Sequence, residues 1–168
     1  MNLALHTRHQ AADRFDSERL KAIRQRWLGA LAGKNGLVKN YEDIAPLVSE
    51  EKKYTGITAI PLEAIRGSLG RANDFDARFR PLRKHMQSRW VTVALAWNSP
   101  GWEAIQVYQI GSEYYVLDGH HRVSVAAAMG LRFIDAEVWQ CSLRPACQDC
   151  PLRQPAARAA LASEGCHS

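Results

Sequence analysis

The apolar pattern near the N-terminus predicts a helix. Four large apolar side chains recur there at helical intervals and form one stripe: Leu20, Ile23, Trp27 and Leu31. Ser17 is a suitable N-cap, and the glycines at positions 33 and 36 end the pattern. A helix is therefore predicted from Ser17 to about Ala32, with its apolar stripe against the core.

A second, shorter helix is predicted from Tyr41 to about Ser49. Asn40 can accept a hydrogen bond as its N-cap, and Asp43 stands three residues further on, as in a weak capping box. We expect both helices to dock on the domain that follows. A separate DNA-binding pair is an alternative, although neither helix carries the pattern of a recognition helix.

Several apolar runs predict strands. The first covers 57–65, where Pro61 favours a sheet edge because it has no N–H to donate. A loop rich in glycine and charge follows, a helix is predicted over 77–87, and 90–97 is apolar enough for a strand. The runs 105–110 and 114–118 flank Gly111-Ser112-Glu113 and predict a hairpin. The alternating run 133–139 predicts a strand with one wet face.

This order of elements predicts a small α+β domain with a mixed sheet. We expect a helical extension over 1–50, the α+β domain over 51–140 and a cysteine-containing tail over 141–168. The chain has 168 residues, enough for one core, and its apolar fraction of 46% is ordinary for a globular protein.

The most informative stretch is D-G-H-H-R at 118–122, between an apolar strand and an alanine-rich helix that Gly130 ends. A helix N-terminus after a glycine turn offers free amide donors and a positive dipole, and this environment binds phosphate. Arg122 supplies a two-pronged donor, while His120 and His121 add hydrogen bonds. An ordinary strand-turn-helix with solvated histidines fits these residues equally well.

Composition sets limits on partners. The net charge is +5, and residues 1–34 hold seven Lys/Arg against three Asp/Glu. This favours weak, non-specific contact with nucleic acid or, equally, a solvated helix face. No apolar run is long enough to span a membrane and no secretory signal is visible, so we expect a cytoplasmic protein without a membrane partner.

All four cysteines stand near the C-terminus, at Cys141, Cys147, Cys150 and Cys166. A C-x2-C pair with two further thiolates can bind zinc tetrahedrally, and an iron–sulfur cluster also takes four thiolates. The first gap of five residues is unusual for either site. Free thiols are the alternative, since disulfides are rare in a reducing cytoplasm.

The hairpin, the D-G-H-H-R turn and the following helix resemble the ParB/sulfiredoxin superfamily over about residues 57–139. Its free serine kinase branch carries the same D-G-H-H-R turn, and the segments I-P-L-E-A-I and G-S-L-G-R resemble the first strand and loop of ParB-like proteins. Sulfiredoxin has a cysteine where this chain has His120, so repair of oxidised cysteine is not expected. The kinase's carboxylate base is also missing, because Ser68 and Leu69 stand at its place.

The resemblance implies a nucleotide, ATP/ADP or CTP, bound with Mg²⁺. Asp118 matches the kinase's catalytic aspartate, and the residues expected around the phosphates are Gly119, His120, His121, Arg122, Ser124 and, from the preceding loop, Arg71. The expected function is nucleotide binding, with hydrolysis or phosphoryl transfer to a small molecule as a further step. A DNA-associated regulatory module without activity is the alternative, and the sequence does not fix the oligomeric state.

Overall fold

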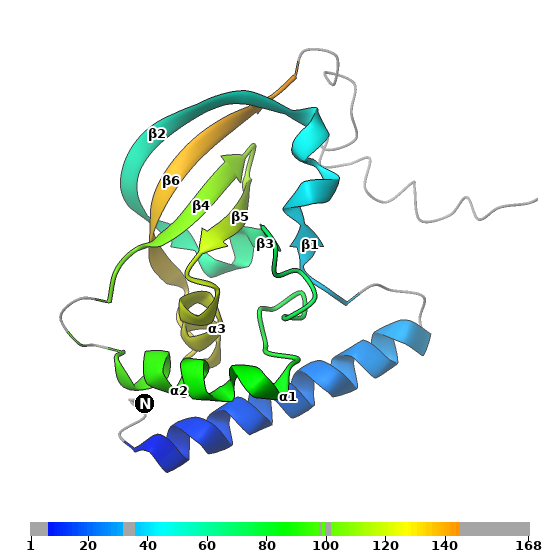
Figure 1. Cartoon of the computed structure of the whole chain (residues 1–168), viewed down its shortest axis with the longest axis vertical. Helices are drawn as coiled ribbons and strands as arrows, with labels where there is room; N and C mark the ends of the chain where they lie inside the picture. Colours follow the sequence, from blue (N-terminus) through cyan, green and yellow to red (C-terminus); the bar gives the residue numbers. More distant parts are fainter. Residues whose placement is uncertain (1–6, 32–35, 98, 100–101, 145–168) are drawn as a thin grey trace, which may run out of the picture.

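The computed structural model describes residues 7–31, 36–97, 99 and 102–144, and its centre is a six-stranded mixed sheet (Figure 1). The strand order is β1-β3-β5-β4-β6-β2. The strands are β1 (Lys39–Asn40), β2 (Val48–Pro61), β3 (Ile65–Ser68), β4 (Ile105–Ile110), β5 (Glu113–Asp118) and β6 (Phe133–Leu143). The α-helices are α1 (Arg8–Leu31), α2 (Gln87–Leu95) and α3 (His120–Ala128). The 3-10 turns are η1 (Tyr41–Asp43), η2 (Ala45–Leu47), η3 (Leu62–Ala64) and η4 (Lys84–Met86).

The pairing of the strands confirms the predicted α+β class with a mixed sheet. Strand β5 pairs antiparallel with β4 and parallel with β3, while β6 pairs parallel with β4 and antiparallel with β2. The predicted hairpin is β4–β5, and Pro61 lies in β2, which is an edge strand as expected. Strand β6 buries Ala136 and Val138, which confirms its alternating pattern.

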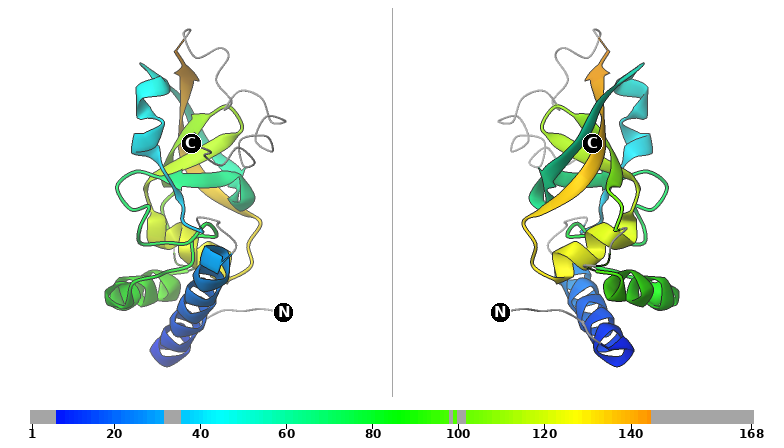
Figure 2. Two further views of the ribbon diagram at one scale, coloured as in Figure 1. Left: turned by 90° about the vertical axis from the view of Figure 1, so that its right-hand side faces the viewer. Right: turned by 90° about the vertical axis from the view of Figure 1, so that its left-hand side faces the viewer.

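The three helices gather at one end of the sheet (Figures 1 and 2). Helix α2 packs against both α1 and α3, and its fully buried Trp90 meets Phe15 of α1 edge to face at 5.7 Å. This aromatic contact belongs to the main hydrophobic core, to which the sheet contributes residues such as Ile105, Val107 and Val116. No helix in the described part of the chain is long and apolar enough to cross a membrane.

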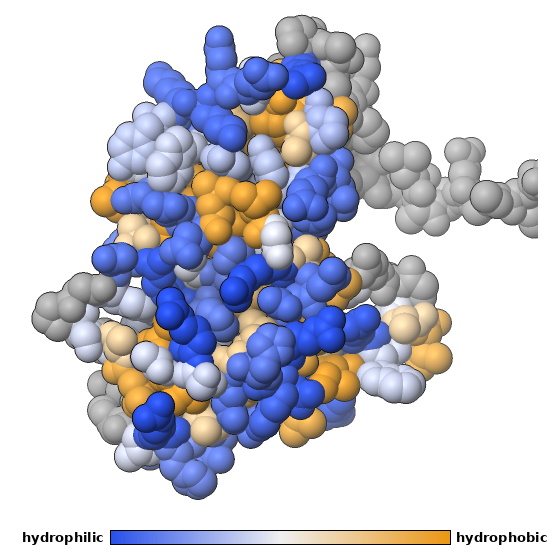
Figure 3. All heavy atoms as spheres, in the orientation of Figure 1, coloured by the Kyte–Doolittle hydropathy of each residue, from blue (hydrophilic) through white to orange (hydrophobic). Residues whose placement is uncertain are grey.

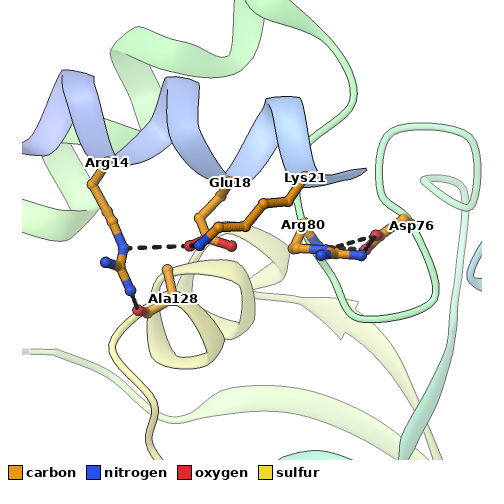
Figure 4. Close-up of polar contacts among 6 residues, drawn as sticks. All are labelled: Arg14, Glu18, Lys21, Asp76, Arg80 and Ala128. Atoms are coloured by element: carbon orange, nitrogen blue, oxygen red, sulfur yellow. Dashed lines mark hydrogen bonds and ion pairs between the residues drawn. The ribbon is translucent and has the colours of Figure 1, made fainter. Parts of the chain in front are cut away.

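Charged side chains also hold α1 in place (Figure 4). The carboxylate of Glu18 is almost fully buried, where an unpaired charge would be costly. Lys21 Nζ lies 2.8 Å and Arg14 Nε 3.4 Å from Glu18 Oε1, and Arg14 also donates to the carbonyl of Ala128 at the end of α3. Glu18 is thus neutralised within α1, and Arg14 links α1 to α3.

The N-terminal helix differs from its prediction in start and orientation. It begins at Arg8, so Ser17 is an interior residue and not the N-cap. The residues it buries are Ala11, Phe15, Glu18 and Ala22, whereas Leu20, Trp27 and Leu31 of the predicted stripe are exposed. The predicted stripe therefore faces away from the core, because Phe15 and two small alanines let α1 pack closely on its other side.

The segment after Asn40 forms two 3-10 turns instead of one helix. Asn40 is the expected cap, accepting a hydrogen bond from the amide of Glu42 at 3.4 Å. Pro46 lies at the start of η2, where its missing N–H is tolerated, and the chain is already extended at Val48.

The predictions for 77–87 and 90–97 were wrong. The loop before α2 is organised by Asp76, which accepts hydrogen bonds from the amides of Arg78 and Arg80 and pairs with the Arg80 guanidinium at 2.6 Å. The run 90–97 belongs mostly to α2, because Trp90 and Ala94 face the core four residues apart on one side of a helix. A short apolar run suits a buried helix as well as a strand.

The structure joins the predicted extension to the sheet. Residue 50 lies within β2, β1 pairs with β3, and β6 continues to Leu143. The described part of segment 1–50 therefore contributes one strand, the beginning of another and a helix packed on α2.

We expect Gly67→Ala to destabilise the fold, because a β-carbon at this position in β3 would overlap the buried ring of Tyr115. Overpacking of this kind costs roughly 1–3 kcal/mol of unfolding free energy. Gly36→Ala is the matched control, since a β-carbon there meets nothing within 4 Å. Chemical denaturation of both variants tests the contact, and equal stability of the two would contradict it.

Candidate functional site

A cleft of about 600 Å³ opens where α3 begins. Three segments form it: the loop after β3, the η4–α2 segment and the β5–α3 turn. Its lining residues are Leu69, Gly70, Arg71, Asp74, His85, Met86, Arg89, Val93, Leu117, Asp118, Gly119, His120, His121 and Arg122. The structure thus brings Arg71 and the whole D-G-H-H-R turn to one cavity.

Gly119 determines how the chain enters α3. Its φ of +93° lies in the left-handed region, and an added β-carbon would lie 2.5 Å from Cγ2 of Ile105. The first helical hydrogen bond runs from the amide of Val123 to the carbonyl of Gly119 at 3.0 Å. No described residue accepts a hydrogen bond from the amides of His120, His121 or Arg122. These free donors lie at the positive end of the helix dipole.

His120 links α3 to β3. Its Nε2 shares a hydrogen bond of 2.7 Å with Oγ of Ser68, and both side chains are buried. Burial, reinforced by the Arg71 guanidinium, lowers the pKa of His120 to about 4. At neutral pH this imidazole is therefore an uncharged hydrogen-bonding group.

His121 is also neutral at pH 7. Burial and the nearby guanidinium groups of Arg71 and Arg89 lower its pKa to about 4. Its ring meets Phe75 edge to face, and no described residue hydrogen-bonds its buried Nδ1. This nitrogen needs a partner, since a buried polar atom without one is destabilising.

Arg122 is held by the protein itself. Its Nη1 donates to the carbonyls of Glu103 and Ala104 at 2.6 and 2.9 Å, and its Nη2 lies 2.6 Å from Oδ2 of Asp118. These three hydrogen bonds use most of the five donors of a guanidinium. Arg122 therefore fixes the turn against the residues before β4, in addition to any contact with a ligand.

Two other arginines supply the positive charge of the cleft. Arg71 is half exposed and lies 4.0 Å from the carboxylate of Asp74, a loose ion pair. Arg89 of α2 has no ion-pair partner among the described residues and also lines the cleft. Arg89 was not among the predicted site residues, because the apolar run from residue 90 was interpreted as a strand. The interval of four between His85, Arg89 and Val93, which all line the cleft, is the helical signal for this wall.

Two predicted site residues lie outside the cleft. Ser124 is a buried residue of α3, and its Oγ accepts a hydrogen bond from Nε1 of Trp90 at 3.0 Å. It therefore acts as a packing contact between α2 and α3. Cys141 is buried in β6, and burial raises the pKa of its thiol.

The metal site expected in the tail stays a prediction, because Cys147, Cys150 and Cys166 lie outside the described residues. Within the residues that the structure describes, no three side chains of His, Cys, Asp or Glu are grouped to hold a metal ion.

Comparison with known proteins gives one structural likeness. No family model and no curated protein matches the chain. Sulfiredoxin from Arabidopsis thaliana is similar over 51% of this chain and 86% of its own, with 21% identity and a TM-score of 0.39. At this level the likeness decides nothing about the activity of this chain.

We expect Arg122→Ala to lower the unfolding free energy by about 2–3 kcal/mol, because it leaves two carbonyls and a carboxylate without their shared donor. Asp118→Asn is the control: it keeps an acceptor for Nη2, and its side chain is mostly exposed. Denaturant unfolding of both proteins measures the difference. An Arg122→Ala protein as stable as the wild type would contradict this structural role.

The buried histidines predict a loss of stability in acid. Between about pH 6.5 and pH 4, His120 and His121 bind protons in the unfolded chain but not in the folded protein. The unfolding free energy therefore falls as the pH falls through this range. His120 contributes on the order of 2 kcal/mol over that interval. His120→Asn should flatten the pH profile of the unfolding free energy, whereas His9→Asn, on the exposed side of α1, should leave its slope unchanged. Equal slopes for all three proteins would disprove the assignment.

Proposed function

We propose that the cleft binds the phosphates of a nucleotide, ATP/ADP or CTP, at the N-terminus of α3. One observation carries the proposal: at the start of a nine-residue helix, three backbone amides have no partner among the described residues, and the residues that carry them line a cleft of about 600 Å³. Backbone amides at a helix N-terminus bind phosphate oxygens through directed hydrogen bonds and the helix dipole. Gly119 supports this role because it carries no side chain that would cap the helix.

The cleft also has the charges that phosphates need. Arg71 and Arg89 approach from two different segments, and the imidazoles of His120 and His121 add uncharged hydrogen-bonding groups. Nδ1 of His121, which has no partner among the described residues, can donate to a phosphate oxygen or accept from a hydroxyl, according to the tautomer of the ring. The guanidinium of Arg122 is largely committed to the protein, so most of the charge at the phosphates comes from Arg71 and Arg89.

Asp118 is the residue that turnover would require. Its side chain is 69% exposed at the cleft, and a carboxylate there can hold Mg²⁺ or orient an acceptor. Bound Mg²⁺ would neutralise charge on the phosphates during transfer. Hydrolysis, or transfer to a small molecule, is the reaction class that this arrangement favours. The alternative is a regulatory module in which the same cleft contacts a nucleic-acid backbone.

Calorimetric titration of the full chain with ATP, ADP, CTP and GTP in Mg²⁺ tests the proposal. We expect saturable binding, and Arg71→Gln or Arg89→Gln should each weaken it roughly ten- to hundredfold through loss of a charge-assisted hydrogen bond. Arg66→Gln is the matched control, since Arg66 is exposed and lies outside the cleft. Asp118→Asn should keep binding and abolish turnover.

Two results would count against nucleotide binding. One is the absence of both heat and thermal shift with every nucleotide at millimolar concentration. The other is salt-sensitive, sequence-independent DNA binding that Arg71→Gln and Arg89→Gln weaken, which would favour the regulatory module.

A further inference from the structure

The C-terminal half of α1 exposes an apolar stripe. Its four large side chains are unusually accessible: Leu20 is 59%, Leu28 62%, Trp27 72% and Leu31 85% exposed. Intervals of seven and four residues place Leu20, Trp27 and Leu31 on one side of the helix, opposite the buried Phe15 and Ala22. Apolar atoms gather at this end of α1 in Figure 3, and α1 lies at one end of the molecule (Figures 1 and 2). A row of large exposed apolar side chains of this kind is typical of an interaction site.

Positive charge predominates along the stripe, and the carboxylate nearest to it on this side, Asp16 one turn before Leu20, is paired with Lys84. Residues 19–31 contain Arg19, Lys21, Arg24 and Arg26 and no Asp or Glu. Lys21 is paired with Glu18, and Arg19 donates to the carbonyl of Leu82. Arg24 and Arg26 make no ion pair with a described residue, so their charge is available to a partner.

We propose that this face of α1 docks on the surface of a bilayer that contains anionic phospholipids. A helix with leucine and tryptophan on one side and arginines among and beside them is typical of segments that lie in the membrane interface. Trp27, near the middle of the stripe, suits the headgroup level, where its ring is apolar and its N–H is polar. Anionic headgroups complement Arg24 and Arg26. Such docking needs no spanning segment.

The position of Arg24 favours a bilayer over a partner helix. Intervals of four residues place it beside both Leu20 and Leu28, within the stripe and not at its rim. A packed helix would bury this guanidinium and would have to pair it. At a bilayer the long arginine side chain can instead extend to the phosphates while its neighbours enter the apolar region.

Charge also disfavours a second copy of this chain as the occupant. Pairing two such stripes would bring the Arg24 side chains of both chains together, and residues 19–31 offer no carboxylate to oppose them. A groove of about 430 Å³ runs beside the stripe between α1 and Leu82–Arg83, and its arginines, Arg26 and Arg83, add further positive charge.

Co-sedimentation of the full chain with vesicles tests the proposal. We expect binding to phosphatidylcholine vesicles that contain phosphatidylglycerol, weak binding to phosphatidylcholine alone, and weakening as salt is raised. Trp27 should move into a less polar environment. This is measured as the difference between the fluorescence shifts of wild type and Trp27→Phe, because the chain has five tryptophans.

Matched variants test whether the vesicles bind to the stripe on α1 or to another exposed apolar surface. Leu31→Ser should weaken vesicle binding roughly tenfold, and Arg24→Gln and Arg26→Gln roughly fivefold each. Ile57→Ser, which removes a side chain of similar exposure (63%) from β2, should change nothing. Because all these side chains are outside the core, melting temperatures should stay close to the wild-type value.

Four results would overturn membrane docking. The first is no sedimentation with anionic vesicles at low salt, and the second is binding that Ile57→Ser weakens as much as Leu31→Ser. The third is a concentration-dependent dimer in analytical ultracentrifugation that Leu31→Ser dissociates, which would assign the stripe to a second copy. Vesicle binding that Arg71→Gln and Arg89→Gln abolish while Leu31→Ser leaves it intact would place the lipid phosphate in the cleft and also reject this surface. The first three results leave nucleotide binding untouched, whereas the fourth would identify lipid phosphate as a ligand of the cleft proposed for nucleotide.

Discussion

The close contact between Gly119 and Ile105 is the constraint on which the candidate site depends. The left-handed turn at Gly119 can press against Ile105 only because it has no β-carbon. With the backbone this close, Arg122 reaches the carbonyls of Glu103 and Ala104, which lie just before β4. The same turn directs His120 back to Ser68 of β3. One glycine therefore fixes the start of α3 relative to two strands.

In this arrangement one set of residues determines the shape of the cleft and another set supplies its charge. Two residues fix the turn. Arg122 directs most of its donors to acceptors within the protein, and burial keeps His120 uncharged. Positive charge instead comes from Arg71 and Arg89, which lie on segments outside the turn. The same guanidinium groups help to keep the imidazoles uncharged, because like charges in a partly buried cavity repel. An anion entering the cleft would meet amides and guanidinium groups without requiring a buried histidine to be protonated.

The sequence predicted those parts of the fold whose signals are local. The β4–β5 hairpin, Gly119 and the end of α3 at Gly130 follow from turn chemistry and short apolar runs, and so does the capping by Asn40. The position of α2 was not predicted, because its short apolar run is compatible with a strand and with a buried helix. The packing of Trp90 against Phe15, which favours the helix, is not visible in the local sequence. Arg89 was missed with it. The role of Ser124 depends on Trp90, a contact between residues 34 apart, which no local pattern reveals.

The orientation of α1 shows why periodicity alone does not identify a core face. Two sets of residues recur at helical intervals on this helix: a small one around Ala11, Phe15 and Ala22, and a large one that includes Leu20 and Trp27. Hydrophobicity favours burying the larger set. Packing selects the smaller, because alanines let α1 approach α2 closely enough for Phe15 to reach Trp90, while Glu18 is neutralised by its own neighbours. The larger apolar face is therefore left at the surface with arginines beside it. Because an exposed apolar face lowers the solubility of a protein, we expect this face to bind a partner.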